Sequence, residues 1–167
     1  MTVSQDMRDK VSALLGREPR GLEAVPVVDE QGNPSVIQVR ALVDGKPFPT
    51  LFWLVDPSIC YRIDQAEAGG LIARLQSRID ADPELQEAMR RDHLAYIALR
   101  NERMTDEVRE GLAASGFAGV LDRRGVGGIA DFTRIRCLHT WYGAHLVLPN
   151  TVGAMLEAWW TEQPGEL

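Results

Sequence analysis

The chain has 167 residues and a mass of 18.5 kDa, which is enough for one domain with its own hydrophobic core. Apolar residues make up 45% and charged residues 25%, and these ordinary globular values exclude wholesale disorder and fibrous folds. The net charge of −6 opposes approach to nucleic acids, and the basic residues are scattered rather than clustered, so we expect no nucleic-acid partner.

The cysteine content and the longest apolar run predict a cytoplasmic protein. The two cysteines, Cys60 and Cys137, lie far apart, whereas secreted disulfide scaffolds carry more cysteines at closer spacing. The segment 1–16 is charged and amphipathic, without the apolar core of a signal peptide. The longest apolar run, Leu51 to Val55, falls far short of the ~20 residues that cross a bilayer, so we expect no membrane partner.

The first predicted element is a helix over 5–15, within an N-terminal segment that we bound at residues 1–16. Ser4 can cap its free amides, and Gly16 is placed to end it. The hydrophobic period then changes from helical to alternating, which predicts strands over 22–28, 35–43 and 50–55.

The short turns between these strands favour an antiparallel meander. Pro26 suits an edge position for the first strand, because proline cannot donate to a neighbouring strand. The third strand, 50–55, is apolar on both faces and is therefore predicted to be central.

The remainder of the chain is predicted to be mainly helical. Asp-Pro pairs at 56–57 and 82–83 are typical helix starts, since aspartate caps and proline is pre-organised for the first turn. The pattern predicts helices that begin at Pro57, at Leu71, at Pro83 (to Arg103), at Thr105, at Phe132 (to about Leu148) and at Thr151 (to Trp160). We predict an α+β fold, in which a small antiparallel three-stranded sheet packs against several helices in a single domain over 17–160, followed by a frayed tail at 161–167.

The richest chemical run lies between residues 137 and 145. On a helix over 132–148, His139 and Tyr142 are neighbours on one face, as are Tyr142 and His145. Cys137 and His139 would point in nearly opposite directions on that helix, so we predict no local metal site. Cys137 is interpreted as a small buried side chain, or as a nucleophile if a histidine from another element reaches it.

A second polar row lies on the predicted helix 83–103. His93, Tyr96 and Arg100 project on one side of that helix and could bind an anion. The alternative is a solvated polar face with Tyr96 half-buried. The carboxylates of Asp64 and Asp80 are interpreted as helix-end charges rather than as an acid/base pair.

A glycine-rich segment over 123–128 follows these helices. Arg124, Gly127 and Gly128 could bind phosphate or carboxylate if the segment runs into a helix N-terminus. It matches neither a dinucleotide fingerprint nor a P-loop, and tight turns are the commoner use of such glycines.

Several segments together resemble a bacterial family filed as domain of unknown function 501. They are Phe48-Pro49-Thr50-Leu51-Phe52-Trp53-Leu54, Arg62 to Gly69, His93 with Tyr96 and Arg100, Gly125 to Ile129, Cys137-Leu138-His139 and Ala144-His145. The resemblance spans roughly residues 15 to 160 and implies that these residues form one site, without implying a reaction. Family members often carry Thr-Cys-Pro where this chain has Val55-Asp56-Pro57, so no cysteine role is transferred to that position.

Three functions follow as hypotheses. The first is a site for a small phosphate- or carboxylate-bearing molecule lined by Tyr96, Arg100, Tyr142, His145, Arg124, Gly127 and Gly128, with His139, His93 and Cys137 as candidate catalytic residues. The second is a non-catalytic interaction module that self-associates or binds a partner through Trp159 and Trp160. The third is a metal-assisted hydrolase. The sequence identifies no cofactor and does not decide whether the chain is an enzyme.

Overall fold

The computed structural model describes residues 2–163. Its first element is the predicted helix, α1 (Gln5–Leu15). The Ser4 hydroxyl accepts a hydrogen bond from the Met7 amide, and Gly16 ends the helix in the left-handed region at φ 70°. These are the cap and the stop that the sequence predicts.

The three-stranded antiparallel sheet is confirmed. Its strands are β1 (Leu22–Val28), β2 (Pro34–Val39) and β5 (Phe52–Leu54), in the spatial order β1-β2-β5. The prediction that strand 50–55 is central is wrong, because β2 is central and β5 lies at the edge. Helix α6 (Leu138–His145) packs against β5, which explains why an edge strand is apolar on both faces.

The second predicted strand, 35–43, is two shorter ones. β2 ends at Val39, and β3 (Leu42–Val43) pairs with β4 (Lys46–Pro47) in a separate hairpin. Asp44 and Gly45, which form its turn, have φ angles of 51° and 72°. Two consecutive residues with positive φ are typical of a tight hairpin turn. This turn pairs β3 with β4, and the two strands form a sheet of their own.

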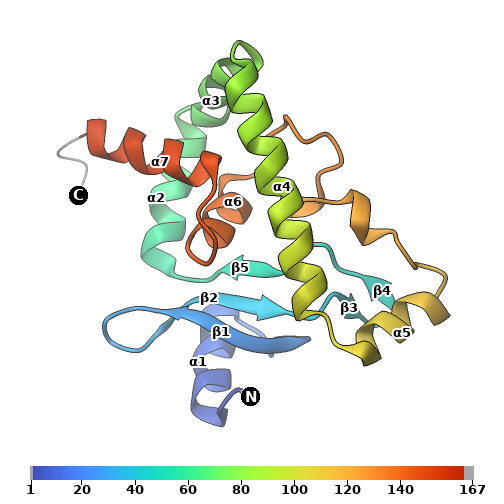
Figure 1. Ribbon diagram of the computed structural model, residues 1–167. Coiled ribbons are helices and arrows are strands. Elements are labelled where there is room, and N and C mark those ends of the chain that lie inside the picture. The colour runs from blue at the N-terminus through green and yellow to red at the C-terminus, as the bar shows by residue number, and fades with distance from the viewer. Residues whose placement is uncertain (1, 164–167) are drawn as a thin grey trace.

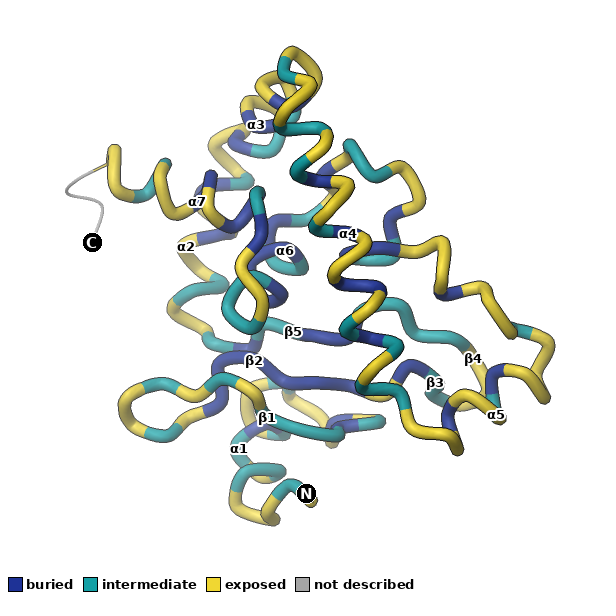
Figure 2. Tube along the Cα trace, viewed as in Figure 1, coloured by how far each residue is buried: buried dark blue, intermediate teal, exposed yellow. Residues whose placement is uncertain are grey.

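Most of the helices lie on one side of the sheet, and α1 lies apart from them with the strands between (Figure 1). The remaining α-helices are α2 (Pro57–Ala68), α3 (Leu71–Asp80), α4 (Pro83–Arg103), α5 (Asp106–Ala114) and α7 (Thr151–Glu162). Every residue of β2 is buried (Figure 2). Val36 packs into the core formed with the helices, whereas Ile37 and Val39 pack with Val11 of α1. Both faces of the sheet are therefore apolar, but helices cover them unequally.

The predicted helix over 132–148 is wrong in its first part. Residues 129–137 are irregular, and α6 begins at Leu138. The Asp131 carboxylate accepts hydrogen bonds from the amide and hydroxyl of Thr133, a local turn that competes with helix formation. The glycine-rich segment forms single 3₁₀ turns, at Leu121–Arg123 and Val126–Gly128, and does not lead into a long helix.

Helix α7 continues through Thr161 and Glu162, the first two residues of the predicted tail, whereas residues 164–167 lie outside the described part of the chain. Among the helices within residues 2–163, none combines the length and the hydropathy needed to cross a bilayer.

Candidate functional site

Helix α2 presents a polar stripe toward the start of α6. The Asp56 carboxylate caps α2 by accepting from the amides of Ser58 and Ile59. Cys60, Asp64 and Glu67 follow at a spacing of four and then three residues, which places them on one side of the helix. Ile63 and Ala66 are buried, and their packing against the core orients the helix.

Cys137 and His139 meet at the N-terminus of α6. Cys137 is the cap residue and is extended, with φ −148° and ψ 122°, whereas His139 lies in the first helical turn. The Sγ atom of Cys137 therefore lies 3.5 Å from Nδ1 of His139. The expectation that these side chains diverge is wrong, because Cys137 does not belong to the helix.

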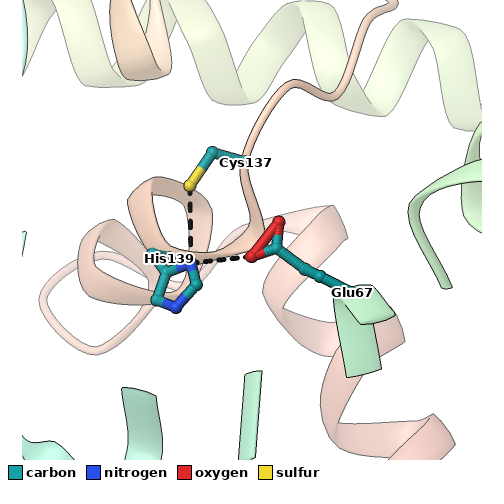
Figure 3. A group of neighbouring side chains, drawn as sticks. All are labelled: Glu67, Cys137 and His139. Carbon is teal, nitrogen blue, oxygen red and sulfur yellow. Dashed lines mark hydrogen bonds and ion pairs between the residues drawn. The ribbon is translucent and has the colours of Figure 1, made fainter. Parts of the chain in front are cut away.

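The carboxylate of Glu67 joins this pair from α2 (Figure 3). Its Oε1 atom lies 2.8 Å from His139 Nδ1, and the ligating atoms of Glu67, Cys137 and His139 all lie within 4.8 Å of one another. Bonds of about 2.0–2.3 Å to one tetrahedral zinc would separate such atoms by ~3.3–3.6 Å. The sulfur–nitrogen distance already matches, whereas the oxygen lies closer to the nitrogen than two ligands of one ion would and needs a small shift of the Glu67 side chain.

Asp64 holds the opposite edge of the imidazole. Its Oδ1 atom lies 2.8 Å from His139 Nε2. A carboxylate on the second ring nitrogen is the usual outer partner of a metal-bound histidine, because it fixes the ring and directs the other nitrogen to the metal. The side chains of Glu67 and His139 are 24% and 27% exposed, so the cluster is accessible from solvent.

Cys60 differs from Cys137 in its surroundings. Burial raises the pKa of the Cys60 thiol, and the negative charges of Asp64, Asp56 and Cys137 raise it further. The protonated Cys60 thiol lies 3.7 Å from the Leu54 carbonyl, to which it donates. The two thiols thus share one neighbourhood, but only Cys137 faces the imidazole.

A hollow of about 290 Å³ adjoins the cluster. Its residues come from the end of the sheet and the start of α6: Thr50, Phe52, Trp53, Leu54, His139 and Thr140. His139 therefore connects the cluster to a space that a small molecule could enter.

The structure places His93 in the interior, away from this cluster. It is 0% exposed, stacks on Phe132 at 4.6 Å and meets Trp141 edge-on at 4.8 Å. Its Nδ1 accepts from the Val126 amide. Burial lowers the pKa of His93 to about 4, so the ring is neutral at physiological pH.

Tyr96 and Arg100 are likewise occupied by backbone groups. Tyr96 is 3% exposed, and its hydroxyl accepts from the Leu51 amide at 2.6 Å. Arg100 is 1% exposed and donates to the carbonyls of Pro49, Leu121 and Arg124. This α4 row, defined as His93, Tyr96 and Arg100, fastens the loops at 49–51 and 121–126 to the long helix.

The glycine-rich segment closes over the α4 row. A Cβ atom on Gly125 would lie 2.0 Å from His93 Nδ1, and one on Gly128 would lie 2.9 Å from a Pro49 side-chain atom. Gly127 and Gly128 have φ angles of 65° and 75°, as tight turns require. Arg124 is exposed, and its carbonyl is one of the acceptors of Arg100.

Tyr142 and His145 form a separate pair against α7. Their rings stack at 5.6 Å, and both approach Glu157, at 3.1 Å from the Tyr142 hydroxyl and 3.3 Å from His145 Nε2. Burial and the charge of Glu157 raise the pKa of Tyr142 to about 12. Trp160 packs edge-on against Tyr142 and lies under the Arg62 guanidinium, and Trp159 is half-buried, so neither aromatic is a bare surface ring.

The structure thus unites Cys137 with His139, and Tyr142 with His145, but keeps both pairs apart from the α4 row. Sequence reasoning missed Glu67 and misjudged Asp64, which lies within α2 rather than at its end. The available signal was their spacing of three residues on one helix, which places two carboxylates side by side.

Comparison with known proteins identifies a family. A family model described as protein of unknown function (DUF501) matches residues 25–158. No curated protein and no solved structure matches the chain.

Proposed function

The chain belongs to the DUF501 family of proteins of unknown function, and we propose from its geometry that it is a metal-dependent hydrolase with one Zn²⁺-type ion. The observation that carries the proposal is the convergence of Glu67, Cys137 and His139 on one point, with Asp64 on the far side of the imidazole. Thiolate, imidazole and carboxylate are the donors that zinc takes in proteins.

The number of ligands favours a catalytic rather than a structural ion. Structural zinc sites supply four protein ligands, whereas catalytic sites supply three and leave one position for water. A Cys137 thiolate, a Glu67 carboxylate and a neutral His139 together carry a charge of −2, which balances a divalent ion. A metal-bound water is acidic enough to form hydroxide near neutral pH, and this is the nucleophile of metal-assisted hydrolysis.

The adjoining hollow is the place for the substrate. It is mostly apolar, and His139 lies in its wall. The sequence predicts a phosphate- or carboxylate-bearing ligand, and we retain that class, with the metal as the group that binds the anion. Arg100, Tyr96 and His93 take no part in this proposal, because their side chains are buried and bind backbone groups of the interior.

The proposal is tested by metal binding. Purified chain is stripped with a chelator and titrated with Zn²⁺ against a chromogenic competitor, and then with Co²⁺, whose spectrum reports thiolate coordination. We expect one metal ion per chain and a cysteine-to-cobalt charge-transfer band. Cys137→Ser should weaken zinc binding by at least ~100-fold, because each ligand contributes several kcal/mol.

Cys60→Ser is the matched control, since it removes the neighbouring thiol that faces Leu54. It should leave zinc affinity and the cobalt band unchanged. Equal losses in both cysteine variants would show that the ligand set is wrong, and no zinc binding in the unmodified chain would reject the metal proposal altogether.

A second candidate is thiol catalysis, in which Cys137 is the nucleophile. The 3.5 Å contact with His139 and the Asp64 partner resemble a cysteine-histidine-carboxylate triad. Glu67 opposes this function, because a carboxylate 2.8 Å from Nδ1 competes for the same nitrogen as the thiol. Rapid alkylation of Cys137 relative to Cys60 in a chain that binds no zinc would favour this alternative.

A further inference from the structure

A second cavity lies on the other face of the sheet, beneath the end of α1. It has a volume of about 310 Å³, within the range of small-molecule sites. Ile37 and Val39 of β2 contribute to it from the sheet, and Leu15 contributes from α1. The rings of Phe48 and Trp53, stacked at 5.5 Å and 19°, add an aromatic part to its apolar wall.

This cavity exists because the two sheet faces are covered unequally. The face that carries Val36 packs against several helices, whereas the face that carries Ile37 and Val39 packs mainly against α1. Helix α1 ends at Leu15, and the segment that follows it lines the cavity instead of filling it. An apolar surface is thereby left open to a ligand.

The rim of the cavity is cationic. Arg17, Arg20 and Lys46 line it with a single carboxylate, Asp44. Arg20 is already paired with Asp44 at 2.9 Å. Within residues 2–163 no carboxylate pairs with Arg17 or Lys46, and both are exposed. The rim thus carries two uncompensated positive charges on a chain whose net charge is −6.

We propose that this cavity binds a small amphipathic carboxylate, of the class of a medium-chain fatty acid, independently of the metal cluster. The hydrocarbon chain would cover the apolar wall, and the carboxylate would lie between Arg17 and Lys46. Two free cations are too few for a lipid surface, which is recognised by clusters of about 4–8 basic residues. The enclosed apolar wall distinguishes the ligand from inorganic anions.

The test compares octanoate with 1-octanol, which has the same chain but no charge, by isothermal titration calorimetry. We expect octanoate to bind with a Kd below about 1 mM, as a well-placed ligand of this size can, and 1-octanol at least tenfold more weakly. The double variant R17Q/K46Q should weaken octanoate binding about tenfold and leave 1-octanol binding unchanged.

The control is R74Q/R91Q, which removes the same charge from exposed positions on α3 and α4 and should not alter octanoate binding. Leu15→Trp should fill the cavity and abolish the binding of both compounds. Equal binding of octanoate and 1-octanol, an unaffected R17Q/K46Q variant, or no octanoate binding at 1 mM would each overturn the proposal. Because zinc titration is a separate measurement, either proposal can fail alone.

Discussion

The α4 row and the cluster of Glu67, Cys137 and His139 each combine a histidine with two other polar side chains, but they use them in different ways. In the α4 row, each polar side chain is almost fully buried and binds a backbone group of a distant loop. In the cluster of Glu67, Cys137 and His139, the side chains are partly exposed and face one another. A polar row that binds backbone stabilises the fold, whereas one whose donor atoms converge can bind a ligand.

The comparison shows that residue type and helical spacing do not identify a site. His93, Tyr96 and Arg100 have the regular spacing that predicts a binding face, yet that face points into the core. The cluster combines a helix with a non-helical cap residue, so its convergence depends on the tertiary structure. Mutations in the α4 row should therefore lower the free energy of unfolding, whereas mutations in the cluster should lower metal affinity.

Arg100→Met should have the largest effect and should act on stability alone. It removes the guanidinium that donates to the carbonyls of Pro49, Leu121 and Arg124 and thereby ties three loop positions to α4. We expect the free energy of unfolding to fall by about 3–5 kcal/mol in urea denaturation. Zinc affinity of the folded fraction should be unchanged.

Arg91→Met on the exposed side of the same helix is the control and should shift the free energy of unfolding by less than ~0.5 kcal/mol. A large loss of zinc affinity in Arg100→Met would mean that the two regions are coupled and that the comparison fails.

The pH dependence of stability should identify His93 as an interior group. Its pKa is about 4 in the fold and near 6.5 when unfolded, so between these values the unfolded chain binds more protons. The stability from the neutral ring is present above pH 6.5 and falls by about 3 kcal/mol as the pH drops through 4. His93→Gln should flatten this part of the curve, measured by urea denaturation from pH 7 to 4.

Parallel curves for His93→Gln and the unmodified chain would show that the imidazole is not held neutral by burial. His145→Gln is the matched control, since the His145 ring lies 3.3 Å from the half-exposed carboxylate of Glu157, whereas no carboxylate within residues 2–163 contacts His93.

The elements could be predicted from sequence because their signals are local. Ser4 and Gly16 bound α1, and the Asp-Pro pairs at 56–57 and 82–83 start α2 and α4. The position of a strand within the sheet, by contrast, depends on tertiary contacts rather than on local sequence. Strand β5 has the composition of a central strand because α6 covers it, and no pattern within residues 50–55 distinguishes a helix from a strand as the neighbour.

The candidate site was only partly predictable. The sequence identifies Cys137 and His139 as chemically capable, but it places the start of the helix at Phe132 rather than Leu138, which reverses the predicted direction of the thiol. Boundaries are the part of a helix that sequence patterns specify least well, and the boundary decides the direction of a cap residue's side chain. The contribution of Glu67 requires the packing of α2 on α6, which no local signal specifies.

Asp64→Asn should have an intermediate effect, confined to the metal. Asparagine keeps the shape of the side chain but loses the charge that orients His139 through Nε2. Outer carboxylates of this kind contribute about 10–100-fold to metal affinity, and we expect a loss in that range by competition with a chromogenic chelator. Asp106→Asn, in the first turn of α5, removes the same charge far from the site and should leave zinc affinity unchanged.

Tyr142→Phe should have the smallest effect. It tests whether a residue of α6 whose side chain points away from the cluster influences metal affinity. Tyr142 is three residues from His139, yet its hydroxyl contacts Glu157 of α7 rather than the cluster. Loss of this one hydrogen bond, to a half-exposed carboxylate, should lower the free energy of unfolding by about 0.5–1 kcal/mol. Zinc affinity should stay within about twofold of the unmodified chain, because no ligand or outer partner changes. A tenfold loss of zinc affinity would mean that the metal site includes Tyr142. The distinction between polar groups that converge and polar groups with separate partners would then fail.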